Sequence, residues 1–89
     1  MKEKIVQKIK DALTQLSVEI ETFSVDYSAD SKFGDFSSNV ALVVAKKLGK
    51  KPHDTAHQLM ALLSGQFDDI EKIEIAGPGF INFFVSRNF

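Results

Sequence analysis

Three side chains near the carboxyl end of the chain have the types and spacing of a surface that reads a nucleic-acid base. Phe80, Asn82 and Phe84 alternate with other apolar residues in the stretch FINFFV. Successive side chains of a strand point to opposite faces, so one face would be core and the other would carry two aromatic rings and an amide. Exposed rings stack on unpaired bases, and an amide has donors and acceptors for a base edge. This pattern favours contact with single-stranded RNA.

The same residues allow a second interpretation, in which both faces of the strand are covered. Asn82 would then satisfy a turn or a backbone group, as buried polar side chains usually do. Gly77, Pro78 and Gly79 supply turn chemistry just before the strand and would shape its start in either case. The residues alone leave both interpretations open.

Four lysines gather at the end of an apolar run in the middle of the chain: Lys46, Lys47, Lys50 and Lys51. Lysines stabilise the negative end of a helix dipole, and they also contact phosphate groups. Both roles fit these positions. The formal net charge of the 89-residue chain is −1, whereas general nucleic-acid binders depend on many Lys and Arg contacts. Any nucleic-acid contact is therefore expected to be local.

Other chemistry-bearing residues lack the partners that a metal or catalytic site needs. His53 and His57 stand four residues apart, but a zinc site takes three or four ligands and no third is close in sequence. An acidic run is interpreted as a solvated edge between a helix and a strand: Asp68, Asp69, Glu71 and Glu74. No phosphate-binding loop or catalytic triad is indicated. The sequence predicts no metal, no cofactor and no enzyme activity for this chain alone.

Hydrophobic periodicity predicts the elements that must position these residues. Apolar residues recur at three- and four-residue steps over 2–16 and favour an amphipathic helix. Alternation over 22–28 favours a strand, and turn-forming residues at 31–39 favour a loop ending in a helix cap. Capping and turn residues around 40–49 and 50–65 favour two more helices. Residues 70–76 and 80–85 predict two strands of a hairpin.

The expected fold class is α+β, a two-layer arrangement in which helices cover one face of a small, largely antiparallel sheet. The expected order is helix, strand, helix, helix, strand, strand, in one domain over residues 1–89. Hydrophobic residues make up 44% of the chain, which excludes the composition of a disordered protein. The chain has no cysteine, which is typical of a reducing compartment, and the cytoplasm is the expected location. No segment resembles a membrane span.

Two longer motifs closely resemble the N-terminal additional domain of arginyl-tRNA synthetases. They are FGDFSSNVALVVAKKLGKKP at 33–52 and IEIAGPGFINFFVS at 73–86. The family pattern is an F-G-D-aromatic loop with a downstream Asn, an A-K-x-L-G helix end and an A-G-P-G-F-I-N hairpin. Residues that match it are 33–36, Asn39, 45–49 and 76–82. The resemblance covers essentially the whole chain.

The resemblance implies a module that binds arginine tRNA and reads an unpaired base of its D-loop, at the outer corner of the tRNA. Phe80 would stack on that base and Asn82 would hydrogen-bond it. A mainly structural role is expected for the F-G-D loop. Gly34 would allow a turn conformation closed to other residues, and Asp35 or Asn39 would bond local amides.

The resemblance also implies that the chain is a fragment of a longer enzyme, an ATP-dependent arginine-tRNA ligase. The HIGH-like and KMSK-like ATP-binding signatures of that enzyme are absent here. ATP and Mg²⁺ would belong to the catalytic domain of the same polypeptide, which would be a partner of this module. A rival hypothesis is an interdomain or protein–protein packing module without RNA contact, in which Phe80 and Phe84 pack against a partner domain.

Overall fold

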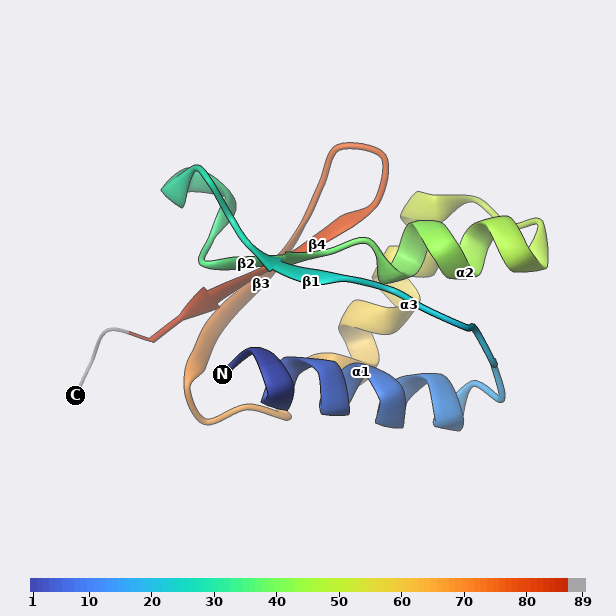
Figure 1. The fold of residues 1–89 in the computed structure, drawn as a ribbon, viewed down its shortest axis with the longest axis horizontal. Coiled ribbons are helices and arrows are strands. Elements are labelled where there is room, and N and C mark those ends of the chain that lie inside the picture. The colour runs from blue at the N-terminus through green and yellow to red at the C-terminus, as the bar shows by residue number, and fades with distance from the viewer. Residues whose placement is uncertain (87–89) are drawn as a thin grey trace.

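The sheet is the element that positions the predicted base-reading residues. In the computed structural model, which describes residues 1–86, four strands lie in the order β1-β2-β4-β3 and every neighbouring pair is antiparallel (Figure 1). The strands are β1 (Val25–Tyr27), β2 (Phe36–Ser38), β3 (Ile70–Ala76) and β4 (Phe80–Val85). Residues 87–89, where a junction with a following domain is expected, lie outside the described residues.

The described helices are α1 (Lys2–Gln15), α2 (Val40–Leu48) and α3 (Pro52–Leu63), with a short 3-10 helix, η1, at Ser31–Phe33. Local chemistry sets their ends. Pro52 stands in the first turn of α3, where its missing N–H is not needed. Gly49 ends α2 in the left-handed conformation, with φ 67°. The α+β class and the predicted order of elements are confirmed.

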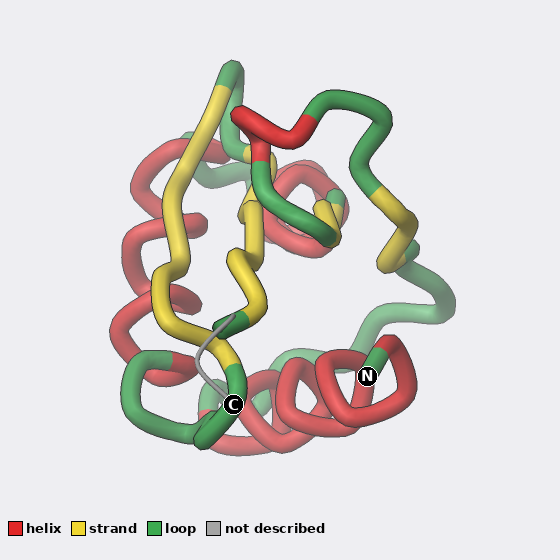
Figure 2. The backbone as a smooth tube through the Cα atoms, turned by 90° about the vertical axis from the view of Figure 1, so that its left-hand side faces the viewer, coloured by secondary structure: helices red, strands yellow, loops and turns green. Residues whose placement is uncertain are grey.

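The core lies between the helices and one face of the sheet. Ile81 and Phe83 of β4 are fully buried there, as the alternation of this strand predicts. They pack with apolar residues of all three helices: Ile5, Ile9, Ala12 and Leu13, then Val40, Ala41 and Val44, then Ala56, Leu59 and Leu63. The opposite face of the sheet, here named the outer face, carries η1 and the β3–β4 turn, which rise from the same side in two views (Figures 1 and 2).

The sequence-based expectation for residues 31–39 is wrong in one respect. Residues 36–38 form β2, which lies in the interior of the sheet between β1 and β4. Its pairing explains the difference, because Phe36 and Ser38 align with Phe83 and Ile81, which are remote in sequence. Strand β1 is also shorter than the predicted 22–28.

Candidate nucleic-acid interface

A pocket of about 380 Å³ opens on the outer face of the sheet. Its lining comes from the η1 segment, from β2 and from both strands of the hairpin: Ser28, Phe33, Ser37, Ala76, Gly77, Pro78, Phe80 and Asn82. None of these side chains is charged, and aromatic and small apolar groups surround a few polar ones. Such a lining suits a flat, neutral ring with a polar edge better than it suits a phosphate group.

Phe80 forms a wall of this pocket and is 39% exposed. The G-P-G turn before it is closed by a hydrogen bond in which the Gly79 N–H donates to the Ala76 carbonyl at 3.3 Å. Gly79 has φ 147°, and a Cβ at this position would lie 3.1 Å from Pro52 at the start of α3. The turn therefore needs glycine there, and its contact with α3 fixes the position of Phe80.

Asn82 lies at the floor of the pocket and is only 3% exposed. In the sheet register it aligns with Ser37 of β2 and Glu74 of β3. Within residues 1–86 its side-chain amide makes no hydrogen bond, and none of its polar atoms is sealed from solvent without a partner. The near burial of Asn82 agrees with the interpretation in which both faces of the strand are covered, but in the described part of the chain no turn or backbone group bonds its side chain. The amide is available to a ligand in the pocket.

Phe84 shares the outer face with Phe80 and Asn82 but does not line the pocket. It is half-buried, and the Lys72 ammonium lies 4.2 Å from the centre of its ring. A Cβ on Gly34 would lie 3.3 Å from Phe84 as well, so the F-G-D loop approaches this ring closely. The structure therefore brings Phe80 and Asn82 together and separates Phe84 from them.

The F-G-D loop is anchored on β4, as the expected structural role requires. Gly34 has φ 88° and packs on the β4 backbone, where a Cβ would lie 2.7 Å from the Phe83 carbonyl oxygen. The Asp35 N–H donates to that same oxygen at 2.8 Å, and the Val85 N–H donates to Asp35 Oδ2 at 2.8 Å. These partners are some fifty residues away in sequence, so the bonds are tertiary and not local.

Asn39 is also structural. Its Oδ1 accepts a hydrogen bond from the Ser24 N–H at 2.8 Å and so ties the entry to β1 to the start of α2. The cap of α2 comes from the preceding residue, because Ser38 Oγ accepts the Val40 N–H at 3.1 Å. Sequence reasoning placed these residues correctly near the helix start, but the bond partner of Asn39 is tertiary.

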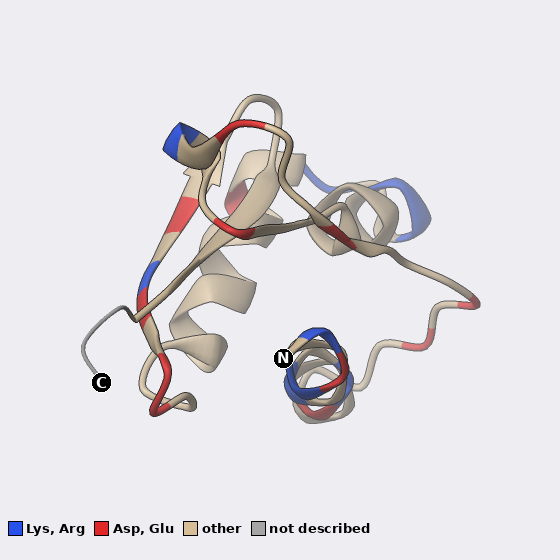
Figure 3. Ribbon diagram, turned by 60° about the vertical axis from the view of Figure 1, so that its left-hand side comes forward, with Lys and Arg blue, Asp and Glu red and all other residues tan. Residues whose placement is uncertain are grey.

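The four lysines lie exposed at the end of α2 and the start of α3. Figure 3 shows the basic stretch running from the far end of α2 to the start of α3, and its α3 end approaches the β3–β4 turn, where Pro52 lies against Gly79. Lys47 Nζ donates to the Glu19 carbonyl oxygen and so also has a structural contact. The lysine that adjoins Pro52, Lys51, is thus close to the turn beside the outer-face pocket, whereas Lys47 lies against the segment that follows α1.

The remaining candidates gain little from the structure. The His53 and His57 rings stand with their centres 4.8 Å apart, but residues 1–86 contain no group of three metal-ligating side chains. In the acidic run, Asp69 pairs with Lys4 at 3.3 Å and Glu74 with Lys72 at 3.7 Å. These groups are parts of a solvated, ion-paired edge.

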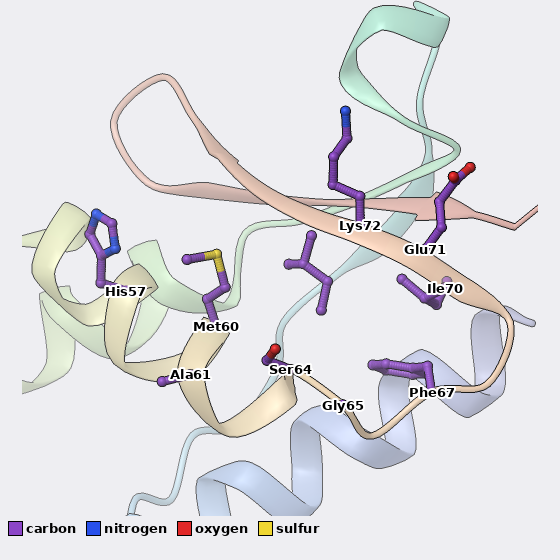
Figure 4. A pocket seen from close by; sticks show the side chains of 10 residues that line it. His57, Met60, Ala61, Ser64, Gly65, Phe67, Ile70, Glu71 and Lys72 are labelled. Atoms are coloured by element: carbon purple, nitrogen blue, oxygen red, sulfur yellow. The ribbon is translucent and has the colours of Figure 1, made fainter.

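A second hollow, of about 480 Å³, separates α3 from the edge strand β3 (Figure 4). Met60, Phe67 and Ile70 give it an apolar lining, while the charged ends of Glu71 and Lys72 point away from α3. His57 and Glu71 are the residues in its lining that the sequence analysis considered, the first as a metal ligand and the second as part of the acidic run. The hollow therefore lacks the aromatic and amide pair of the outer-face pocket.

Fold and site together define a small α+β domain with an open, aromatic-lined pocket on the outer face of its sheet. None of the described helices combines the length and apolarity needed to cross a membrane. Residues 1–85 match the family model described as "Arginyl tRNA synthetase N terminal domain". The chain belongs to this family and corresponds to the N-terminal domain of such enzymes, not to their catalytic domain.

Individual relatives agree with this assignment. The arginine–tRNA ligase of Pseudomonas fluorescens is 44% identical over 91 residues, which cover 94% of this chain and 16% of the relative. The arginine–tRNA ligase of Chlorobaculum tepidum is 44% identical over 82 residues, which cover 91% of this chain and 15% of the relative. The crystal structure of arginyl-tRNA synthetase from Plasmodium falciparum shares the fold with a TM-score of 0.83, at 21% identity over 97% of this chain and 16% of that chain. The chain thus spans about a sixth of the length of these proteins.

Proposed function

We propose that this chain is the tRNA-recognition module of an arginine–tRNA ligase, and that its outer-face pocket receives an unpaired base of the tRNA D-loop. Phe80 stacks on the base, and the Asn82 amide hydrogen-bonds the base edge. One observation carries the proposal: a nearly buried amide without a hydrogen-bond partner in residues 1–86 lies at the floor of an uncharged pocket, beside a half-exposed aromatic ring.

The energetics of the two contacts are modest but selective. Stacking of a base on an aromatic side chain is worth about 1–3 kcal/mol. A base that enters the pocket without bonding the Asn82 amide leaves that amide buried and unpaired, which costs about 1–3 kcal/mol. Asn82 therefore contributes mainly to specificity, because it disfavours such bases. Glycine at 77 and 79 shapes the turn that holds Phe80, and Pro78 lies in the same wall.

Phosphate contacts come from the lysine cluster beside the turn. The floor of the pocket is flanked by carboxylates, because Asp26 aligns with Ser37 and Glu74 aligns with Asn82 in the sheet register. Asp26 repels phosphate from the floor, and Glu74 does so less because it pairs with Lys72, whereas Lys50 and Lys51 lie next to the turn through the Pro52–Gly79 contact. An RNA strand leaving the pocket over the turn therefore meets Lys50 and Lys51 first, and Lys46 and Lys47 lie farther along, in the last turn of α2.

In this proposal, residues 1–89 act as one domain of a longer cytoplasmic enzyme and supply orientation, not bond making. The partners are arginine tRNA and the catalytic domain of the same polypeptide. ATP and Mg²⁺ belong to that catalytic domain. The residues described here do not fit them, because the glycine-rich turn leads into a strand and no three metal-ligating side chains meet.

The test is a titration of the ¹⁵N-labelled chain with an arginine tRNA transcript at low ionic strength, followed by NMR chemical shifts. We expect shifts clustered on residues 77–84 in the wild type and their loss in Phe80→Ala and Asn82→Ala. Tyr27→Ala is the matched control, because Tyr27 is an aromatic side chain with 77% exposure that does not line the pocket. It should bind like the wild type.

Two outcomes would oppose the proposal. Shifts confined to the lysine cluster would indicate nonspecific attraction of phosphate, and no shifts at all would favour a packing module without RNA contact. In that alternative, Phe80→Ala would weaken docking to a partner domain and leave tRNA binding by the longer enzyme unchanged.

A further inference from the structure

Phe33 is the exposed aromatic residue that the F-G-D motif leaves unexplained. It is 44% exposed at the end of η1, outside the core, and it lines the same pocket as Phe80 and Asn82. The other two residues of the motif hold the loop on β4, whereas the Phe33 side chain performs no comparable anchoring. Phe33 and Phe80 expose two rings on one pocket, and contiguous apolar exposure of this kind marks a contact site, whereas a single exposed ring does not.

The η1 segment holds this ring in place through several hydrogen bonds. Asp30 Oδ1 accepts the Lys32 N–H at 3.0 Å, and the Asp30 carbonyl accepts the Phe33 N–H at 2.9 Å. On the other side of Phe33, Gly34 lies against the Phe83 carbonyl and the Asp35 N–H bonds it. The backbone is thus fixed on both sides of Phe33, which lowers the conformational entropy lost when a ligand binds.

Phe33 also has a cation beside it, which is shared with a carboxylate of the same segment. The Lys32 ammonium lies 5.2 Å from the centre of the Phe33 ring and 3.8 Å from Asp30 Oδ2. Lys32 is therefore a cation next to a pocket whose own lining is uncharged. A nucleotide presents both features, a flat ring for the pocket and a phosphate for the cation beside it.

We infer that Phe33 is a second stacking wall, so that the pocket holds an unpaired RNA base between aromatic side chains of η1 and of β4. This inference rests on the proposed function and adds a specificity-determining residue to it. Phe80 and Asn82 come from one strand of a hairpin, and Phe33 comes from a separate segment that tertiary contacts bring across the outer face. Both walls are aromatic, so the pocket would stack on both faces of a flat base, whereas one wall would stack on a single face.

The test compares Phe33→Leu and Phe33→Tyr with the wild type in the same tRNA titration. Phe33→Leu keeps an apolar side chain without a ring, and we expect affinity to fall roughly tenfold, in line with the loss of one base-stacking contact. Phe33→Tyr restores a ring and should bind within roughly twofold of the wild type. Tyr27→Leu removes an exposed ring that does not line the pocket and should leave affinity unchanged.

A direct readout separates stacking from a purely structural role. In the wild-type complex, nuclear Overhauser contacts should join the Phe33 ring protons to protons of a base, and the thermal midpoint of free Phe33→Leu should match that of the wild type. If Phe80→Ala loses binding while Phe33→Leu binds like the wild type, the second wall is wrong and the proposed function stands. If the wild type gives no pocket shifts, both proposals fail.

Discussion

Replacement of Gly34 by alanine tests whether the F-G-D loop holds the outer face together. Gly34 has φ 88° and ψ −165°, a backbone region that is essentially restricted to glycine and costs other residues about 1–3 kcal/mol. The added Cβ would also lie 2.7 Å from a backbone oxygen of β4, so the loop must move. Movement weakens the bond from the Asp35 N–H, worth about 1 kcal/mol, and the bond to its carboxylate, worth about 1.5–3 kcal/mol.

The expected destabilisation of Gly34→Ala is therefore about 3–6 kcal/mol in the free energy of unfolding, a large share of the total for a domain of this size. Urea denaturation followed by circular dichroism measures it. Gly65→Ala is the matched control, because Gly65 also has a positive φ, 79°, but nothing lies within 4 Å of the added Cβ. It should lose only about 1–2 kcal/mol. Equal losses in the two variants would refute the anchoring role of the loop.

Three further predictions concern contacts outside the pocket. Asn39→Ala removes the bond to the Ser24 N–H and should lower the free energy of unfolding by about 1–2 kcal/mol, measured by urea denaturation. The double variant Lys50→Gln, Lys51→Gln should weaken tRNA binding and lower the slope of log affinity against log salt by up to about 2, while shifts at the pocket persist at saturation. Lys4→Gln breaks a partly exposed ion pair and should lower the free energy of unfolding by less than about 1 kcal/mol, measured by urea denaturation.

Local pattern was sufficient to predict the hairpin and the two faces of its second strand. Ile81 and Phe83 are buried and Phe80 is exposed because the side-chain period of a strand is two, and no distant residue changes that period. Glycine and proline were sufficient to predict the helix ends, because each acts through its own backbone angles and needs no distant partner. These features depend on residues that are close in sequence.

Features that depend on remote partners could not be predicted in this way. The sequence FSS has weak strand character, and β2 exists because β4 pairs with it. The position of η1 over the outer face follows from bonds to β4 that span some fifty residues, so no local signal shows that Phe33 and Phe80 share a pocket. The near burial of Asn82 has the same origin. The signal in the sequence was an aromatic residue, Phe33, next to the turn-forming Gly34. Only the fold shows that its ring is exposed and lines the pocket.

In the proposed function, a domain with a net charge of −1 would take part in RNA recognition through a few local contacts. One stacked base and one hydrogen-bonded edge supply a few kcal/mol, which is comparable to the cost of bringing two free molecules together. Carboxylates beside the floor of the pocket, Asp26 and Glu74, lower the affinity for RNA in general and leave the base contact as the favourable term. Such a module discriminates well but holds its ligand weakly. Under the proposed function, its discrimination would become effective when another part of the same polypeptide holds the tRNA and raises the local concentration of the base at the pocket.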